Sequence, residues 1–589
     1  MAPQLLRPQI LLLASLLLTS LCLDASERRS EIRVSLGEQA ARAITELGLE
    51  VPLVGRLFFI VAKDDTQMPH LGTGVTGNPL WGIDVRDFGP GESVVFRSGD
   101  PDISGYPFQS LDELPEGTYY VQAFINVYTS FERADGHLIE AHMNSGAFQN
   151  VFAAPGNGYS DVKKITVGSE GIGSLSLTIS SVIQPARPLE DGEVLQLSNF
   201  EDTEWVRYVK IRSEKLSKFW GRDMYIGANV LLPPGYEERT DTTYPVLYLQ
   251  GHSSGLTPVP WAPAEWFRPG YEAEHAAVGP QLDDFYEAWT AGDLEKLVVI
   301  TFRDANPFFD TSYSVNSPNV GPYADAIFEE LIPYLEDRFR IVAEPWGRVL
   351  AGRSTGGWEA AAMMIFNPEQ FAGAFPWAPD PVDFRKLMQL NIYESDSAFF
   401  NELEWIRTPI PAQRDIDGLV NYSMLDEYRY EQTVASKDRS GGQWAVWQAL
   451  FSPVGEDGYP APLWDPVTGL IDQDIANYWR EHWDLSHILE RDWSELGPKL
   501  SGKLHFAVGR RDNYYLEQAV YLLEERLAGL ANPIPAATFQ YGINGRHSWI
   551  GHSTEDPTKQ LRYREFIDVV ADYIRAGAPK DADLSGWSY

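Results

Sequence analysis

The chain has 589 residues, of which 44% are hydrophobic and 13% aromatic, and its formal net charge is -36. A chain of this length and composition is not disordered as a whole and can bury at least one large hydrophobic core. The negative charge repels nucleic acids and anionic membrane surfaces, so neither is expected as a partner. The single cysteine, Cys22, excludes disulfides and cysteine-bound zinc. No His-Glu-x-x-His spacing occurs, so no metal ion is expected.

The N-terminus has the pattern of a signal peptide. Arg7 precedes an apolar run, 10–18, that is too short to span a bilayer, and small, polar and charged residues follow it. We therefore predict that residues 1–25 are a signal peptide. This implies a secreted or periplasmic protein without stable membrane insertion.

The sequence that follows the predicted signal peptide is typical of an all-β region. Between about residues 50 and 180 the apolar segments are short and are separated by Gly, Pro and Asp turns, which is typical of antiparallel strands. We predict a β-sandwich-like domain over residues 30–183. The range 184–204, which contains Pro185 and Pro188, is expected to be a linker.

From residue 205 continuous apolar runs alternate with helical periodicity, which predicts an α/β domain over 205–576 with a mostly parallel sheet between helices. Strands are expected at 246–249, 297–302, 348–351, 373–377, 503–508 and 538–541, and helices at 324–339, 358–366, 516–527 and 559–575. A tryptophan-rich insertion, 381–500, interrupts this alternation and is expected to form a lid or pocket wall. The last residues, 577–589, are expected to be a disordered tail.

The pattern Gly-x-Ser-x-Gly occurs twice, around Ser253 and around Ser354. A reactive serine of this pattern lies on a tight turn between a strand and a helix. Both serines follow an expected strand, but the residues after Ser354, 357–364, are strong helix formers. Ser253 is followed by three prolines at positions 258, 260 and 263, which cannot continue a helix. Ser354 is therefore the predicted nucleophile.

A serine hydroxyl needs a histidine to accept its proton and a carboxylate to orient that histidine. His547 follows the last expected strand, at the sheet edge where open α/β sheets bind ligands, and is the predicted base, with His552 as the alternative. Asp512, after the preceding strand, is the predicted acid, although it also has the position of a helix N-terminal cap. Asp380, one strand earlier, is the alternative acid.

The anionic oxygen that forms during attack on a carbonyl needs two backbone N–H donors. One comes from the residue after the nucleophile and one from the loop after an early strand. Thr355 and His252 occupy these positions. The glycines around Ser253 thus allow the turn that brings the His252 amide to the site.

These residues resemble the putative-esterase family of α/β hydrolases, which includes S-formylglutathione hydrolase, feruloyl and acetylxylan esterases, enterochelin esterase and the mycobacterial mycolyltransferases. The likeness rests on segments 221–224, 232–236, 244–249 and 330–334, on the glycine-rich turn at Ser354, on 509–512, and on His547 with an aromatic residue two positions later. The resemblance implies an α/β-hydrolase fold and the triad Ser354, Asp512 and His547. It covers roughly 205–380 and 500–575, and so does not extend to the N-terminal domain or the insertion.

We interpret the chain as a secreted serine esterase that works through an acyl-enzyme and needs no cofactor. The expected substrate is a small-molecule or glycan-linked ester, neutral and bearing an aryl or sugar group. Trp261, Trp266 and Trp377 are predicted to line its pocket, because flat aromatic faces stack on both groups. Two alternatives remain open: a serine peptidase or acyltransferase of the same fold, and a catalytically silent glycan-binding protein.

Overall fold

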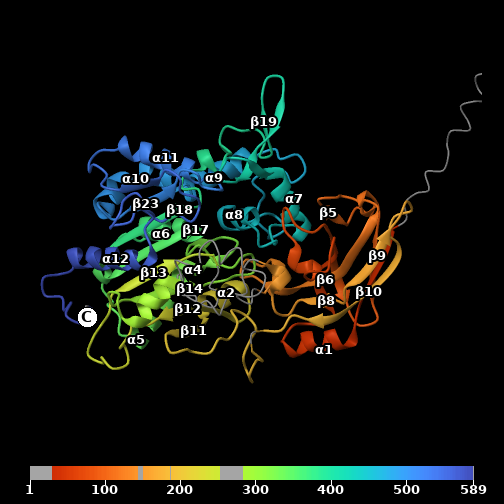
Figure 1. The fold of residues 1–589 in the computed structure, drawn as a ribbon, viewed down its shortest axis with the longest axis horizontal. Coiled ribbons are helices and arrows are strands. Elements are labelled where there is room, and N and C mark those ends of the chain that lie inside the picture. Colours follow the sequence, from red (N-terminus) through yellow and green to blue (C-terminus); the bar gives the residue numbers. More distant parts are fainter. Residues whose placement is uncertain (1–29, 144–149, 186, 253–282, 588–589) are drawn as a thin grey trace, which may run out of the picture.

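The computed structural model describes residues 30–143, 150–185, 187–252 and 283–587. The predicted signal peptide lies outside these ranges, as do Ser253, Trp261 and Trp266. An N-terminal β region and a larger α/β domain lie side by side (Figure 1). None of the helices in the described ranges is both long and apolar enough to cross a membrane.

The N-terminal region is built around one hydrogen-bonded sheet. Its elements are β1 (Ser30–Leu36), α1 (Glu38–Glu46), β2 (Leu53–Ala62), β3 (Leu80–Phe88), β4 (Ser93–Arg97), β5 (Ser104–Tyr106), β6 (Gly117–Glu132), β7 (Leu138–His142), β8 (Gly158–Ser160), β9 (Lys163–Val167) and β10 (Gly173–Val182). The strand order is β4-β1-β10-β8-β6-β2-β3-β5, with β7 and β9 also paired to β6.

This sheet differs from the expected antiparallel sandwich in two respects. Strands β1 and β10 pair in parallel. The 16-residue β6 pairs with β2, β7, β8 and β9, so one long strand joins what would otherwise be separate sheets. Successive residues of β2 point to opposite faces, and Leu57 and Phe59 enter a different core from Phe58 and Ile60.

The expected linker is packed rather than extended. Leu195 and Leu197 are buried, and the Lys210 ammonium donates hydrogen bonds to the Val194 carbonyl and the Asn199 side chain, both at 3.0 Å. Residues 194–199 are thereby fixed to the first strand of the α/β domain, which contains Lys210.

The α/β domain contains an eight-stranded mixed sheet. Its strands are β11 (Val206–Ser213), β12 (Met224–Leu231), β13 (Val246–Gln250), β14 (Val298–Arg303), β17 (Arg348–Ser354), β18 (Gly373–Pro379), β23 (His505–Gly509) and β24 (Thr538–Gly542). The order is β11-β12-β14-β13-β17-β18-β23-β24. The pairs β11–β12 and β12–β14 are antiparallel and all later neighbours are parallel, so β13, β14, β17, β18, β23 and β24 end at one edge.

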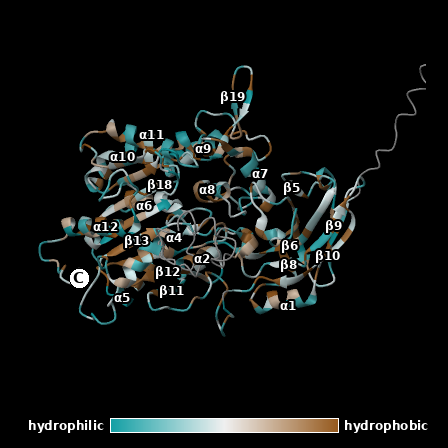
Figure 2. Cartoon of the chain, in the orientation of Figure 1, coloured by the Kyte–Doolittle hydropathy of each residue, from teal (hydrophilic) through white to brown (hydrophobic). Residues whose placement is uncertain are grey.

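Helices cover both faces of this sheet. They are α2 (Glu214–Trp220), α4 (Tyr323–Ala326), α5 (Ile332–Arg338), α6 (Thr355–Phe366), α11 (Glu517–Ala528) and α12 (Tyr563–Gly577). In β13, Val246 and Tyr248 enter the core shared with α5, α6 and α11, whereas Leu247 and Leu249 enter the core shared with α12. Burial on both faces explains the continuous apolar run of this strand, which Figure 2 colours as hydrophobic.

The helix expected over 324–339 is continuous in direction but changes its hydrogen bonding. A π-helical turn, Ile327–Leu331, separates α4 from α5. Pro333, which lies just after this turn, has no backbone N–H to donate, so a regular α-helix cannot be maintained there.

The insertion after β18 forms its own helices and hairpins. They are β19 (Phe400–Glu402), β20 (Arg407–Pro409), β21 (Pro411–Arg414), β22 (Val420–Ser423), α7 (Met424–Val434), α8 (Gln443–Phe451), α9 (Gln473–His482) and α10 (Leu485–Leu500). Six of its tryptophans are buried: Trp444, Trp447, Trp464, Trp479, Trp483 and Trp493. Only Trp405, on the hairpin that projects beside the β19 label in Figure 1, is largely exposed, at 87%. Most of the tryptophan content thus builds a core.

The insertion also joins the α/β domain to the N-terminal region. Helix α7 packs against β3 and β5. The buried Arg56 of β2 donates to the Thr433 carbonyl at 2.9 Å, and Arg439 pairs with Asp84 of β3 at 3.2 Å. The N-terminal region therefore supports α7 and the segment that leads into α8.

In the C-terminal segment expected to be a disordered tail, most residues from 577 to 586 are partly or fully exposed, whereas Trp587 is buried. Trp587 is 1% exposed, stacks on Trp346, and donates through its indole N–H to the Thr243 carbonyl at 3.0 Å.

Candidate active site

Ser354 lies on the turn between β17 and α6, as expected for a nucleophile. Its backbone has φ 59° and ψ -122°, a conformation that L-residues rarely adopt. The flanking glycines make room for this turn. A Cβ atom at Gly352 would lie 2.2 Å from the Gly356 carbonyl oxygen, and one at Gly356 would lie 2.1 Å from that of Gln250. No other residue fits at either position without displacing backbone.

Asp512 and His547 meet at the ends of the two neighbouring strands β23 and β24. His547 Nδ1 lies 2.8 Å from Asp512 Oδ2, and the carboxylate is fully buried. Asp512 Oδ1 accepts a hydrogen bond from the Tyr514 backbone N–H at 2.8 Å, which fixes the orientation of the carboxylate. A carboxylate at Nδ1 keeps the proton on that nitrogen and leaves Nε2 of His547 as an acceptor.

Asp380, the alternative acid, contacts the nucleophile. The Ser354 hydroxyl donates to Asp380 Oδ1 at 3.3 Å, and Asp380 is 4% exposed at the end of β18. Within the described part of the chain, the hydrogen-bond donors to Asp380 are hydroxyl, amide and indole groups, and His547 is paired with Asp512. Within the described residues, His547 thus contacts Asp512, while Asp380 contacts Ser354 instead.

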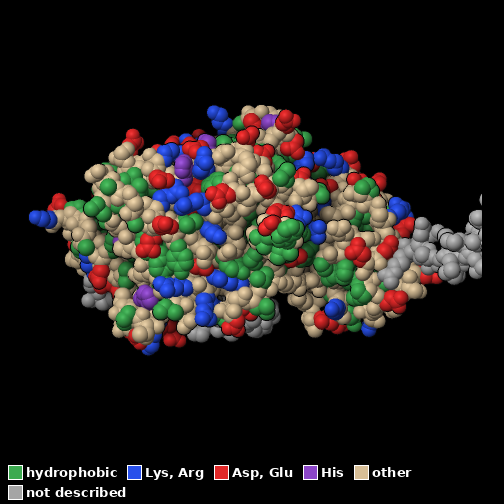
Figure 3. All heavy atoms as spheres, turned by 90° about the horizontal axis from the view of Figure 1, so that it is seen from above, with side chains coloured by type: hydrophobic (Ala, Val, Ile, Leu, Met, Phe, Trp, Pro, Cys, Tyr) green, Lys and Arg blue, Asp and Glu red, His purple; other side chains and the backbone are tan. Residues whose placement is uncertain are grey.

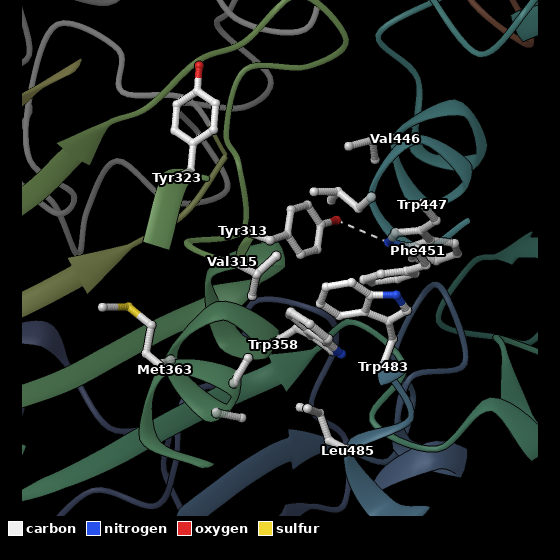
Figure 4. Close-up of a cluster of buried hydrophobic side chains, with 14 of the residues drawn as sticks. Tyr313, Val315, Tyr323, Trp358, Met363, Val446, Trp447, Phe451, Trp483 and Leu485 are labelled. Carbon is white, nitrogen blue, oxygen red and sulfur yellow. Dashed lines mark hydrogen bonds between the residues drawn. The ribbon is translucent and has the colours of Figure 1, made fainter. Parts of the chain in front are cut away.

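Four side chains converge on the second oxygen of Asp380. Oδ2 accepts from Tyr313 at 2.7 Å, Thr355 at 3.1 Å, Gln443 at 3.2 Å and Trp447 at 3.4 Å. Gln443 and Trp447 also donate to the Tyr313 hydroxyl, at 2.8 and 3.0 Å, and Figure 4 shows the indole of Trp447 directed at Tyr313. Burial raises the pKa of Asp380 above its ordinary value, while the hydrogen bonds from Tyr313 and Thr355 oppose that shift.

His252 lies on the opposite side of Thr355. Its Nε2 is 3.0 Å from Thr355 Oγ1, and its Nδ1 is 4.0 Å from a carboxylate oxygen of Asp310. The His252 side chain is 31% exposed, and burial of the rest of the ring, with a smaller effect of the nearby His547, lowers its pKa below the ordinary value. The imidazole is therefore neutral at physiological pH. The two residues predicted to supply oxyanion donors thus lie next to each other.

The loop that carries Tyr313 is held by buried acids. Asp304 Oδ2 accepts from the Ser312 backbone N–H at 2.9 Å, and the Ser314 hydroxyl donates to Glu359 of α6. Burial, together with the charge of Asp304, raises the pKa of Glu359 well above its ordinary value. These contacts stabilise the left-handed backbone of Tyr313, whose φ is 56°.

Two further predicted positions lie away from this cluster. Trp377, expected in the pocket, is 2% exposed and packs on Phe566 of α12 at 4.5 Å between ring centroids, so it is a core residue. Side chains alternate along β18, and that of residue 377 points to the face covered by α12. The ring of His552, the alternative base, packs edge-on against Trp549 at 4.9 Å.

Tyr313, Gln443 and Trp447 were not predicted from the sequence. Gln443 and Trp447 are four residues apart, so they lie on one face of α8, and a polar residue at this spacing from a tryptophan was the one available signal. Among the residues described, no cluster of three or more His, Cys, Asp or Glu side chains is arranged to hold a metal ion.

Comparison with known proteins finds esterase relatives. Residues 217–491 match the putative esterase family. The endo-1,4-beta-xylanase/feruloyl esterase of Xylanibacter ruminicola is 29% identical over 147 residues, which are 24% of this chain and 18% of that protein. The chain thus spans less than a fifth of that curated relative.

Two solved structures are also similar. A ferulic acid esterase has 15% identity and a TM-score of 0.31, covering 58% of this chain and 91% of that chain. An S-formylglutathione hydrolase from Agrobacterium tumefaciens has 15% identity and a TM-score of 0.28, covering 63% of this chain and 93% of that chain. The family match includes Ser354, whereas Asp512 and His547 lie beyond it.

Proposed function

Because residues 217–491 match the putative esterase family, we propose that this protein is a secreted serine esterase that hydrolyses a carboxylic ester. The observation that carries the proposal is the strand-turn-helix at Ser354, together with the 2.8 Å pair of His547 and Asp512 at the same sheet edge. Secretion rests on the signal-peptide pattern of residues 1–25.

The reaction has two halves with one base. Ser354 Oγ attacks the ester carbonyl carbon while His547 Nε2 takes its proton, and the backbone N–H groups of His252 and Thr355 bind the oxyanion. The imidazolium returns this proton to the departing alcohol and leaves an acyl group on Ser354. His547 then takes a proton from water, whose oxygen attacks the acyl carbon, and the proton finally returns to Ser354 as the acid departs.

The free enzyme must change one hydrogen bond before this reaction. The Ser354 hydroxyl donates to Asp380, so it has to turn toward His547 once substrate is bound. The neighbouring Asp512 contributes by holding the imidazole in the tautomer that can accept the proton, and its charge stabilises the imidazolium that forms.

The substrate we propose is a neutral ester with an aryl or sugar group, and amides are poor substrates. The net charge of -36 disfavours polyanions, and Figure 3 shows acidic side chains spread among basic ones over the face seen there. The name of the Xylanibacter ruminicola relative combines xylanase and feruloyl esterase, which agrees with an aryl ester attached to a glycan.

Kinetics on matched substrates test this function. We expect hydrolysis of methyl ferulate or an aryl acetate at least about 100-fold faster than hydrolysis of the corresponding anilide, with Ser354→Ala as the background control. Anilide turnover equal to ester turnover would indicate a serine peptidase. Binding of a glycan without hydrolysis of either substrate would indicate a catalytically silent glycan-binding protein.

A further inference from the structure

The two proposed oxyanion donors come from different parts of the sheet. His252 follows β13, and Thr355 begins α6 immediately after β17. Donors of this kind work only when they are held in place before the charge develops, at about 2.7 to 3.1 Å from the oxyanion. Since the donors are backbone groups, whatever fixes the separation of the two segments also fixes the site.

A side-chain hydrogen bond joins these two segments. His252 Nε2 lies 3.0 Å from Thr355 Oγ1. A threonine hydroxyl has one proton, and here it donates to Asp380 Oδ2 at 3.1 Å, so the contact with His252 is made by a proton on Nε2. A neutral imidazole can carry its proton on that nitrogen. The hydrogen bonds then run in one direction, with His252 donating to Thr355 and Thr355 donating to Asp380.

Asp380 connects this series of hydrogen bonds to the nucleophile. Its Oδ1 accepts the Ser354 hydroxyl at 3.3 Å, while Oδ2 accepts Thr355 and the donors from Tyr313 and helix α8. With so many donors on one buried carboxylate, its position is fixed relative to β17, α6 and the insertion. Asp380 therefore sets where the Thr355 hydroxyl lies, and through it the His252 ring.

We propose that His252, Thr355 and Asp380 form a side-chain clamp that holds the two backbone oxyanion donors at their working separation. The inference rests on the proposed function. The three are positioning residues through their side chains, because these side chains act through the backbone amides and the serine and do not themselves bind the oxyanion. The clamp also gives Asp380 a role distinct from that of a triad acid.

Thr355 variants provide the test, because valine has the shape of threonine without the hydroxyl. We expect Thr355→Val to lower kcat by about 10- to 100-fold with KM changed less than about threefold. Affinity for an arylboronic acid, whose tetrahedral adduct with Ser354 places an oxygen in the oxyanion site, should fall by the same factor. Thr355→Ser should recover most of both losses. A clamp role predicts this parallel loss, whereas a general packing defect does not.

A second pair of variants covers the case in which Thr355→Val does not fold. His252 has a partly exposed side chain, so its replacement disturbs less packing. His252→Leu should weaken boronate binding and kcat together, and His252→Gln, whose amide N–H still reaches the hydroxyl, should recover part of both. Thermal melts and circular dichroism establish that each variant is folded.

The outcomes separate the clamp from the proposed function. If the wild type is active, two results contradict the clamp alone. In one, Thr355→Val is indistinguishable from wild type; in the other, Thr355→Ser is as impaired as Thr355→Val. A loss confined to KM contradicts it too. A wild-type protein that hydrolyses no ester and binds no boronate contradicts the proposed function, and the clamp with it.

Discussion

The ends of the neighbouring strands β18 and β23 each carry a buried aspartate, but the two carboxylates have different partners. Asp512, after β23, is paired with His547 at 2.8 Å and with a backbone N–H. Asp380, after β18, accepts hydroxyl, amide and indole groups, among them the Ser354 hydroxyl. Position on the sheet therefore gives both residues access to the site, and the groups they contact determine what each one does.

The chemical consequence follows from charge and direction. A carboxylate that faces an imidazole N–H stabilises the positive charge formed during proton transfer. A carboxylate surrounded by neutral donors fixes the positions of those donors instead. Substitution of each aspartate by asparagine, which keeps the shape and removes the charge, should separate these roles.

The largest effect is expected at Asp512. In Asp512→Asn an amide faces His547 Nδ1, which favours the wrong imidazole tautomer, and kcat should fall by about 10⁴-fold with the fold intact. The measurement is kcat on an aryl ester, with circular dichroism as the check on folding.

Asp380→Asn is the matched control, because Asp380 is equally buried at the end of the adjacent strand. An asparagine still accepts hydrogen bonds through its oxygen, so the loss in kcat should remain below about 100-fold. A larger loss in Asp380→Asn than in Asp512→Asn would reverse the comparison and make Asp380 the triad acid.

A smaller effect is expected at a third buried carboxylate, Asp438 of the insertion, which sharpens the comparison because it is 3% exposed and lies outside the site. Its Oδ1 accepts from the Gln448 amide at 2.8 Å. Burial raises the pKa of Asp438 from its ordinary value of 3.8 to about 8, although Gln448 and Arg439 oppose the shift. The folded state thus holds a proton that the unfolded state releases.

The sign of the pH dependence follows from this raised pKa. The contribution of the protonated Asp438 to stability is complete below about pH 4 and is lost as the pH rises to about 8. An asparagine at this position cannot ionise and tolerates the left-handed backbone, φ 56°, found here. As the pH rises from 5 to 8, the wild type should therefore lose stability that Asp438→Asn keeps. The difference in free energy of unfolding between the variant and the wild type should grow by more than about 1 kcal/mol over this range. Urea unfolding at both pH values measures this; equal pH dependence in both proteins would contradict it.

Much of the α/β sheet was predictable because its strands are buried on both faces. The strands β13, β14, β17, β18 and β23 were expected close to their observed positions, since each is largely apolar and buried, and the more exposed edge strand β24 was also expected. The edge strand β11 was missed because Arg207, Lys210 and Arg212 interrupt its apolar residues. The helices of the insertion were not assigned, although Trp444 and Trp447, and Trp479 and Trp483, have helical spacing.

Site residues that directly follow a strand could be predicted from the sequence. Site residues brought together by contacts between distant segments could not. Ser354, Asp512 and His547 each lie just after or at the end of a strand of one sheet, so their placement at one sheet edge, and the contact of His547 with Asp512, could be inferred from sequence order. Tyr313 lies on a loop, and Gln443 and Trp447 belong to a helix of the insertion, so sequence order gives no sign that they meet at Asp380. Contacts between such distant segments are fixed only by the tertiary fold.

The most direct test of the central claim is to identify the serine that reacts. The purified protein is treated with a fluorophosphonate, digested and analysed by mass spectrometry, with Ser354→Ala treated in parallel. We expect one phosphonyl adduct, on the peptide that contains Ser354, and no labelling of the variant. An adduct on the peptide that contains Ser253, or labelling that persists in Ser354→Ala, would contradict the assignment of Ser354 as the nucleophile.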